Sequence, residues 1–268
     1  GLVIIVLFIV TILTTLAVDQ ITNYSFYNEY IIKQDLSLRL AKPSLAHPFG
    51  CDEFGRDLLL RILWGTKLSF AIGVVAIALS VIMGAPFGMI AAFYGGKTDN
   101  AIMRVMDVLL AVPYMLLAMA IVAALGTSTF NLLLALAVSG IAKYARIARA
   151  AVLTVKDSEF VEAARAVGAS DGTILFQYIL PNALAPILVQ VSLGIGDSIL
   201  AVAGLSYLGL GVQPPQPEWG AILTTARTYM RDAWHISVFP GLFLILAVIA
   251  FNLFGDGLRD ALDPKLKR

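Results

Sequence analysis

The sequence predicts an all-α, polytopic membrane protein with six transmembrane helices. Hydrophobic residues make up 59% of the 268 residues and charged residues only 14%, whereas a soluble domain carries roughly 25% charge. The mean hydropathy is +0.85, so a single soluble core cannot bury this much apolar surface. The apolar residues are gathered in long runs separated by polar segments, which is the pattern of membrane-spanning helices.

The first two apolar runs flank a long polar loop. Residues 2–18 are uncharged and just long enough for a span that begins upstream of them. They lack the basic leading region and the cleavage site of a secretory signal peptide, so we predict a span. In residues 19–67 a turn rich in Gly and Pro is followed, from Asp57, by an amphipathic helix that leads into the second span, residues 68–94. Local ion pairs explain the charged residues of this loop better than a catalytic cluster does.

Four further runs complete the six spans. The third is expected to be kinked at Pro113. The fourth continues into Lys143, Arg146 and Arg149, which lie on one side of a helix, and such a basic helix end either marks a cytoplasmic exit or binds anionic lipid. The four predicted spans are residues 108–125, 130–149, 183–211 and 235–254.

Glycine, proline and tryptophan residues refine these spans. Gly84, Pro86 and Gly88 are expected to break the regularity of the second helix, which membrane proteins tolerate when neighbours satisfy the freed backbone groups. Trp219 and Trp234 are predicted to lie at the membrane interface. The prolines before Trp219 predict a stiff, exposed loop.

No motif for chemistry or for nucleotide binding is evident. Residues 95–98 (Gly-Gly-Lys-Thr) imitate the end of a phosphate-binding loop, but Ala91 stands where the motif needs a glycine and no strand precedes it. His47 and His235 are far apart, and Cys51 is the only cysteine, which excludes a disulfide within the chain and a cysteine-based zinc site. The net charge of +1 argues against a nucleic-acid partner. We therefore predict neither a metal site nor an enzyme.

A polar segment between the fourth and fifth spans, residues 155–182, stands out. Asp157 or Ser158 can cap a helix start, and Gly168 is placed to end that helix in a left-handed conformation. A second helix starts at Ser170, and Pro181 is expected to end or kink it. The sequence thus predicts two short helices joined by a sharp turn.

The first of these short helices has one apolar side, formed by Phe160, Val161, Ala164 and Val167. Two ordinary interpretations are a helix lying on the lipid surface and a plain connector. Interfacial helices usually carry a basic polar face. The mixed charge and the alanines of this helix favour docking into a groove of another protein.

The same segment resembles the EAA loop of ABC importer permeases. The residues that carry this resemblance are Glu162, Ala163, Ala164, Gly168, Leu180 and Pro181. The family pattern has isoleucine where this chain has Tyr178. The resemblance implies a cytoplasmic coupling helix that docks on an ATP-binding subunit.

Three further segments resemble the C-type permeases of dipeptide, oligopeptide and nickel importers. They are residues 47–65, where Cys51 replaces the usual threonine, residues 205–220 and residues 255–268. The resemblance implies a type I ABC importer permease, with a first span and extracytoplasmic loop in residues 1–67 and a permease core in residues 68–268.

The resemblance also implies the surroundings of the chain. We expect a multi-pass protein of the bacterial inner membrane that forms half of a pathway for dipeptides or oligopeptides, with nickel or a nickel chelate as the alternative substrate. The expected partners are a second, related permease, two cytoplasmic ATP-binding subunits, an extracytoplasmic substrate-binding protein and membrane lipid. ATP and Mg²⁺ are expected on the partner subunits, and no cofactor is expected in this chain.

Polar residues within the fifth span are candidates for the pathway. These residues are Gln190, Asp197 and Ser198. Asp197 is ionisable, and an ionisable residue inside a span indicates either a functional site or an aspartate packed against hydroxyl and backbone groups. Both interpretations remain open. An ion-coupled secondary transporter would need such a residue together with internal repeats, and no convincing repeat is seen.

Overall fold

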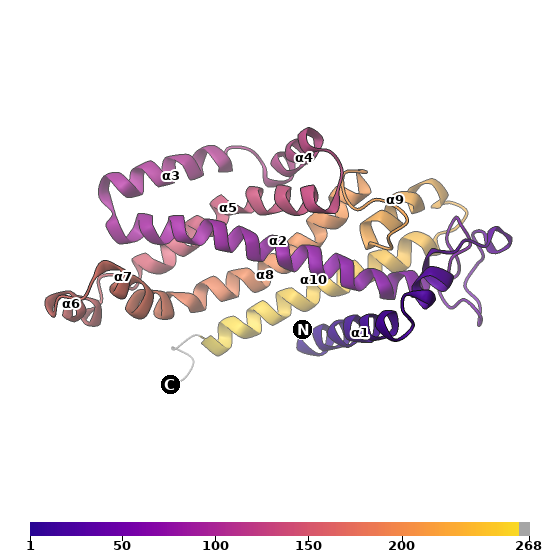
Figure 1. Cartoon of the computed structure of the whole chain (residues 1–268), viewed down its shortest axis with the longest axis horizontal. Coiled ribbons are helices and arrows are strands. Elements are labelled where there is room, and N and C mark those ends of the chain that lie inside the picture. The colour runs from indigo at the N-terminus through magenta and orange to yellow at the C-terminus, as the bar shows by residue number, and fades with distance from the viewer. Residues whose placement is uncertain (263–268) are drawn as a thin grey trace. The chain divides into compact units, whose positions relative to one another are not determined.

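The computed structural model describes residues 1–262, and no β-strand occurs in this part of the chain. In chain order the helices are α1 (Leu2–Ile21), α2 (Leu58–Tyr94), α3 (Gly96–Leu110), α4 (Tyr114–Leu125), α5 (Thr129–Leu153), α6 (Glu159–Ala166), α7 (Asp171–Thr173), α8 (Leu180–Tyr207), α9 (Trp219–Tyr229) and α10 (His235–Leu262) (Figure 1). Short turns are π-helical at η1 (Tyr27–Ile32) and η3 (Ile174–Ile179), and 3₁₀-helical at η2 (Leu36–Leu38). The predicted all-α class is confirmed.

The chain is divided into two compact units, and several helices contribute to both. The first unit comprises residues 1–75, 121–133 and 195–253. The second comprises residues 76–120 and 134–194 and the described residues from 254 on. The division into a first span with its loop, residues 1–67, and a permease core stays a prediction.

Five helical segments are long and apolar enough to cross a membrane, and the bent pair α3–α4 raises this number to six. The five are α1, α2, α5, the continuous stretch from α7 to α8, and α10. The predicted third span, residues 108–125, is not one kinked helix, because α3 and α4 meet at 79° around Pro113. Pro113 has no amide hydrogen to continue α3, and α4, at 12 residues, is too short to cross alone.

The second span is continuous, contrary to the expectation that Gly84, Pro86 and Gly88 interrupt it. Helix α2 runs for 37 residues with Pro86 inside it. The two glycines serve close packing within the second unit instead. A methyl group added at Gly84 or Gly88 would overlap the backbone carbonyl oxygen of Ile141 or Ala145 on α5. Small residues allow membrane helices to approach in this way.

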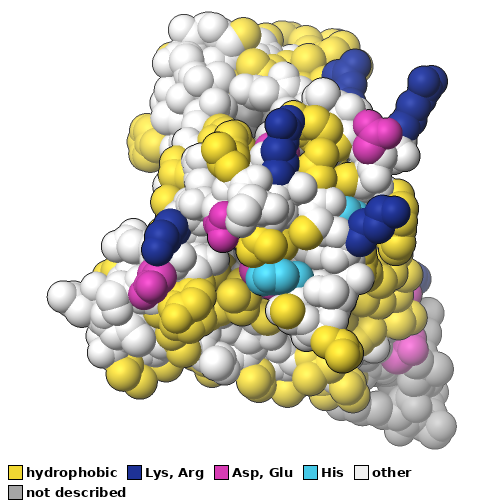
Figure 2. Space-filling view, turned by 90° about the vertical axis from the view of Figure 1, so that its right-hand side faces the viewer, with side chains coloured by type: hydrophobic (Ala, Val, Ile, Leu, Met, Phe, Trp, Pro, Cys, Tyr) yellow, Lys and Arg dark blue, Asp and Glu magenta, His cyan; other side chains and the backbone are white. Residues whose placement is uncertain are grey.

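The polar loop after α1 is held by ion pairs, as predicted. His47 Nδ1 lies 2.8 Å from Asp57 Oδ2, and Asp52 pairs with both Arg56 and Arg61. Exposed Lys and Arg side chains are scattered among acidic and hydrophobic ones on the face shown in Figure 2.

Helix α9 was not predicted, and it corrects the placement of Trp219. The Trp219 side chain is fully buried, and its Nε1 donates to the Ile62 carbonyl at 2.9 Å. Glu218 caps the helix by accepting from the amides of Gly220 and Ala221. The prolines therefore lead into a buried helix start rather than a wholly exposed loop. Trp234, by contrast, is 53% exposed.

The thiol of Cys51 is buried, which changes what labelling can report. Its side chain has no exposed surface, and burial, reinforced by Asp57 and Asp52, raises the pKa of the thiol to about 11. Because the thiolate is the reactive form, only about one thiol in a thousand is ionised at pH 8. We therefore expect Cys51 to stay unmodified until the protein unfolds.

A pair of exposed positions can replace Cys51 as topology probes. Leu45 is fully exposed in the loop after α1, which is predicted to be extracytoplasmic, and Ser170 is exposed before α7. We expect a membrane-impermeant maleimide applied to intact cells to label Leu45→Cys but not Ser170→Cys, and to leave native Cys51 unmodified. Helices α2 and α5 and the bent pair α3–α4 separate the two positions. Labelling of both from outside would show that the bent pair does not cross.

Candidate functional site

The predicted loop segment forms a small helical element attached to the second unit. Helix α6 buries two side chains, Val161 and Ala164, which lie in one apolar cluster with Val152 of α5 and Ile174 and Ile179 of η3. Arg165 covers the ring of Phe93 at 5.6 Å. Figure 1 shows α6 beside α7. The helix is therefore fixed to the unit by packing, not suspended in a free connector.

Only two of the four side chains on the predicted apolar side of α6 are buried within this chain. Phe160 and Val167 are 43% and 83% exposed, although Val161 and Ala164 are buried. Phe176 in η3 is also 63% exposed. Exposed apolar side chains on a fixed helix are typical of a surface that another protein covers.

The start of α6 differs from the prediction. Ser158 occupies the capping position, but its side chain accepts no amide hydrogen bond from the first turn. Its hydroxyl instead donates to the Val155 carbonyl at 2.7 Å. Glu159 and Glu162 lie in the first turn, as predicted, where the helix dipole favours negative charge.

The end of α6 matches the prediction. Gly168 has a φ of +81°, and its amide donates to the Arg165 carbonyl at 3.0 Å. The Ala169 amide donates to the Ala164 carbonyl at 3.0 Å, which completes the turn. Only glycine adopts this left-handed conformation at little cost. Ser170 then caps α7 by accepting from the Thr173 amide.

The second predicted helix is not a separate short helix, because Pro181 does not end it. The chain continues from α7 through η3 into α8, and Pro181 is the second residue of α8. Its missing amide hydrogen would leave the Gln177 carbonyl without a helical donor. The wider π-helical turn of η3 lies directly before Pro181, and such turns occur where the regular hydrogen-bond ladder is disturbed.

The predicted loop residues lie in one helical element but differ in burial. Glu162 and Ala163 lie exposed on α6, Ala164 is buried beneath it, and Gly168 forms its terminal turn. Leu180 packs against the same apolar cluster. Their role stays a prediction.

The three polar residues of α8 do not form one group. Gln190 and Asp197 lie two helical turns apart on the same side of α8. Gln190 is half-buried and Asp197 is exposed. Ser198 is fully buried on a different side of the helix, and within residues 1–262 its hydroxyl has no hydrogen-bond partner.

The basic end of α5 pairs with acids of α3. Arg149 makes two contacts of 2.6 Å with Asp99, and Arg146 lies 2.5 Å from Asp107. Arginine and carboxylate planes match in this two-contact geometry. Sequence reasoning did not find this arrangement, because the arginines and their acidic partners are 50 and 39 residues apart in the chain.

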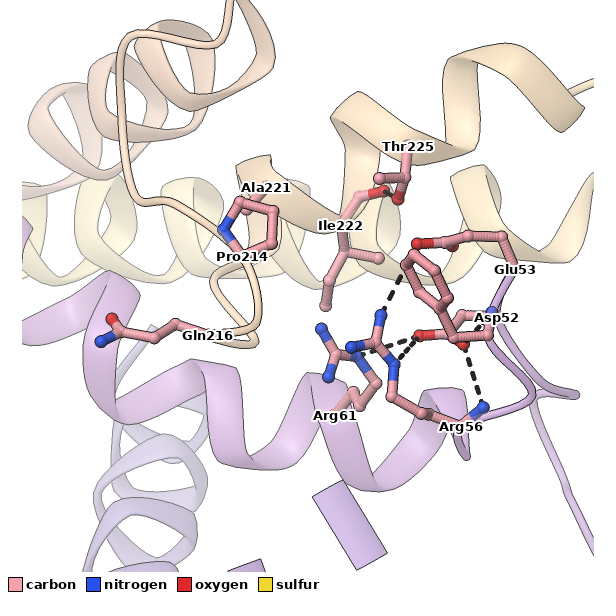
Figure 3. Close-up of a pocket in the computed structure, with 10 residues that line it drawn as sticks. Asp52, Glu53, Arg56, Arg61, Pro214, Gln216, Ala221, Ile222 and Thr225 are labelled. Atoms are coloured by element: carbon pink, nitrogen blue, oxygen red, sulfur yellow. Dashed lines mark hydrogen bonds and ion pairs between the residues drawn. The ribbon is translucent and has the colours of Figure 1, made fainter. Parts of the chain in front are cut away.

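A second cluster of charges lies buried in the polar loop after α1, in the first unit (Figure 3). Asp52 accepts from the Phe54 and Arg56 amides at 2.9 Å and from Arg56 Nε at 2.7 Å, and it lies 3.2 Å from Arg61 Nε. Arg61 also donates to the Ile31 carbonyl at 2.8 Å. Burial, then the neighbouring Asp52, raises the pKa of Glu53. These contacts close the loop on itself, which is a structural task.

A comparison with protein families identifies one match, the binding-protein-dependent transport system inner membrane component, over residues 84–268. A dipeptide transport system permease protein of Alkalihalophilus pseudofirmus is 47% identical over 231 residues, covering 86% of this chain and 76% of the relative. A glutathione transport system permease protein of Pectobacterium atrosepticum is 49% identical over 225 residues, covering 84% and 75%. A probable D,D-dipeptide transport system permease protein of Escherichia coli is 46% identical over 231 residues, covering 86% and 78%.

Solved structures share the fold at low identity. An inward-facing methionine ABC transporter matches with a TM-score of 0.63 and 18% identity, covering 77% of this chain and 98% of that one. An amino acid ABC transporter with histidines matches with a TM-score of 0.61 and 16% identity, covering 76% and 95%.

Proposed function

Because the chain belongs to the family of binding-protein-dependent transport system inner membrane components, we propose that it forms half of the pathway through which an importer takes up dipeptides or oligopeptides. The other half would come from a second, related permease. Two cytoplasmic ATP-binding subunits, which hold ATP and Mg²⁺, and an extracytoplasmic binding protein would complete the machine.

The coarser role does not depend on the substrate. The chain is a multi-pass inner-membrane permease of an ABC importer, and it works with ATPases and other transporter components. It is a transport subunit and not an enzyme, since ATP hydrolysis belongs to its partners. Its own task is to convert their motion into movement of its spans.

The observation that best supports a coupling role is that α6 has one apolar side packed against the second unit and other apolar side chains exposed. Val161 and Ala164 fix the helix to the apolar cluster of the second unit, while Phe160 and Val167 remain exposed. A partner that binds the exposed side chains and displaces α6 would therefore also displace the apolar cluster against which α6 packs. In the proposed cycle, ATP-driven closure of the ATPases displaces α6, and the spans alternate between outward and inward access.

The preference for peptides rests on the names of close relatives. Relatives with 47% and 49% sequence identity to this chain are named for dipeptide and glutathione transport, respectively. Glutathione is itself a small peptide. Among residues 1–262, no group of three or more His, Cys, Asp or Glu is arranged to hold a metal ion. A chelated nickel ion would need no such group, so the uptake of both substrates has to be compared.

We expect the complete importer, reconstituted with its binding protein, to accumulate a labelled dipeptide only when ATP is present. Labelled nickel should not exceed the level seen without ATP. The measurement is uptake into proteoliposomes, with the binding protein omitted as the control. Nickel uptake without dipeptide uptake would reverse the assignment of substrate.

A further inference from the structure

An open groove of about 590 Å³ lies within the second unit, between the ends of three helices. Its lining comes from α5, from α8 and from Arg259 of α10. This volume lies in the range of about 300–1,000 Å³ that is typical of small-molecule sites. None of the lining residues belongs to α6, so the groove is separate from the coupling surface.

Most of the groove wall is apolar. Ile147 and Ala151 of α5 face Pro186, Val189 and Leu193 of α8. A methyl group added at Gly255 of α10 would lie 2.7 Å from the end of the Leu193 side chain and 3.3 Å from its backbone nitrogen, so α10 packs closely against α8 beside the groove. Gly255 is one helical turn before Arg259, which lines the groove.

Two polar groups of the groove have no partner among residues 1–262. Gln190 is half-buried, and its carboxamide makes no hydrogen bond with these residues. Arg259 is exposed, and its guanidinium forms no ion pair with them. A third polar residue, Thr154, already donates its hydroxyl to the Ala151 carbonyl. Within the described residues, the groups left for a ligand are therefore one amide and one cation.

This pair of groups distinguishes between occupants. An anionic lipid would satisfy Arg259 with its headgroup, but its acyl chain would leave the Gln190 amide desolvated without a partner, which is unfavourable. A short peptide offers both complements, since its backbone amides pair with a carboxamide and its terminal carboxylate pairs with a guanidinium in two-contact geometry.

We propose that this groove is a peptide subsite, in which Arg259 binds the terminal carboxylate and Gln190 pairs with the peptide backbone. The apolar wall of α5 and α8 then receives the peptide side chains without selecting among them. The inference rests on the proposed function, because it assumes that peptides pass this permease. Arg259 and Gln190 would act as specificity-determining residues within the membrane subunit.

Protection of a reporter cysteine tests the subsite directly. Ala150 is exposed and lines the groove, whereas Ala101 is an exposed alanine of α3 outside it. In the detergent-solubilised complex, we expect alanyl-phenylalanine to slow maleimide labelling of Ala150→Cys but not of Ala101→Cys. Its C-terminal amide should need roughly tenfold higher concentration for the same protection, because it lacks the carboxylate.

Two variants connect this protection to the named residues. Arg259→Gln should erase the difference between the acid and the amide, and Gln190→Leu should weaken protection by both peptides alike. Copurification with the ATPases and an unchanged thermal midpoint show that each variant is folded and assembled. Equal protection by acid and amide in the unsubstituted groove, or none by either, would overturn the proposal.

The experiments distinguish failure of the peptide subsite from failure of the proposed function. Dipeptide uptake by the complex without protection of Ala150→Cys would refute the subsite and leave the peptide importer intact. Failure of dipeptide uptake would refute the importer assignment, and the labelling assay would still report on the groove. Protection by phosphatidylglycerol micelles but not by peptide would assign the groove to lipid and so overturn the proposal.

Discussion

Replacing Gly168 with valine is expected to abolish uptake while leaving the permease in the membrane. Gly168 has a φ of +81°, and a side chain added there would meet no atom within 4 Å. The penalty is therefore conformational, of about 1–2 kcal/mol, and larger for a β-branched residue. The turn would relax to an ordinary conformation and change the direction in which α6 leaves it. Uptake and copurification of the ATPases measure the result.

Three controls separate conformation from bulk at this turn. Gly168→Asn should retain most activity, because asparagine tolerates the left-handed region. Gly172→Val adds the same bulk close by, at a glycine without positive φ and with no atom within 4 Å. Gly209→Val imposes the same strain elsewhere, at a φ of +80°. Full uptake by Gly168→Val, or equal loss in Gly172→Val, would contradict the conformational explanation.

A second large effect is expected for Asp52→Asn, which keeps the shape of the side chain and removes its charge. Asp52 is 2% exposed and faces Arg56 and Arg61, which are themselves almost fully buried. Breaking a buried ion pair costs about 3–5 kcal/mol, because it leaves charge without compensation. At roughly 2–4 °C per kcal/mol for a chain of this size, the thermal midpoint should fall by about 6–20 °C.

The fluorescence of the buried Trp64 and Trp219 provides the thermal midpoint in detergent. Asp232→Asn is the matched control, since Asp232 is an exposed acid of the same unit, and its midpoint should shift little. In the Asp52→Asn variant, Cys51 should also react with maleimide at a lower temperature than in the native protein. Indistinguishable midpoints for the two variants would show that Glu53 alone balances the arginines.

Much of the fold could be predicted because hydropathy reports directly on lipid contact. The spans of α1 and α5 were placed within four residues at each end, whereas α2 begins ten residues before the predicted span and α10 extends eight residues beyond it. The α3–α4 segment was not placed correctly, because a hydropathy pattern averages over Pro113 and hides the 79° bend. The ion pairs of α3 could not be predicted for a related reason. Their basic members, Arg146 and Arg149, are distant from the acids in the sequence and near them only in the fold.

The candidate site shows the same division between local and distant causes. Gly168 was predictable, because a left-handed helix end is set by its own residue and its immediate neighbours. The burial of Trp219 was not, since it depends on the Ile62 carbonyl across the first unit. The groove of Gln190 and Arg259 was also beyond reach, because nothing in the sequence indicates that α8 and α10 approach there.

The glycine contacts between α2 and α5 have a mechanical consequence. At Gly84 and Gly88 the two helices meet backbone to backbone, so no side-chain rotamer lies between them to absorb a displacement. Side-chain contacts yield by changing rotamers, whereas backbone contacts of this kind yield only by separating whole helices. Because α6 packs on the same part of the second unit through Val161 and Ala164, a push on α6 reaches α2 and α5 together with little loss. Under the proposed coupling role, the stiffness of this joint determines how much of a displacement of α6 becomes movement of the spans.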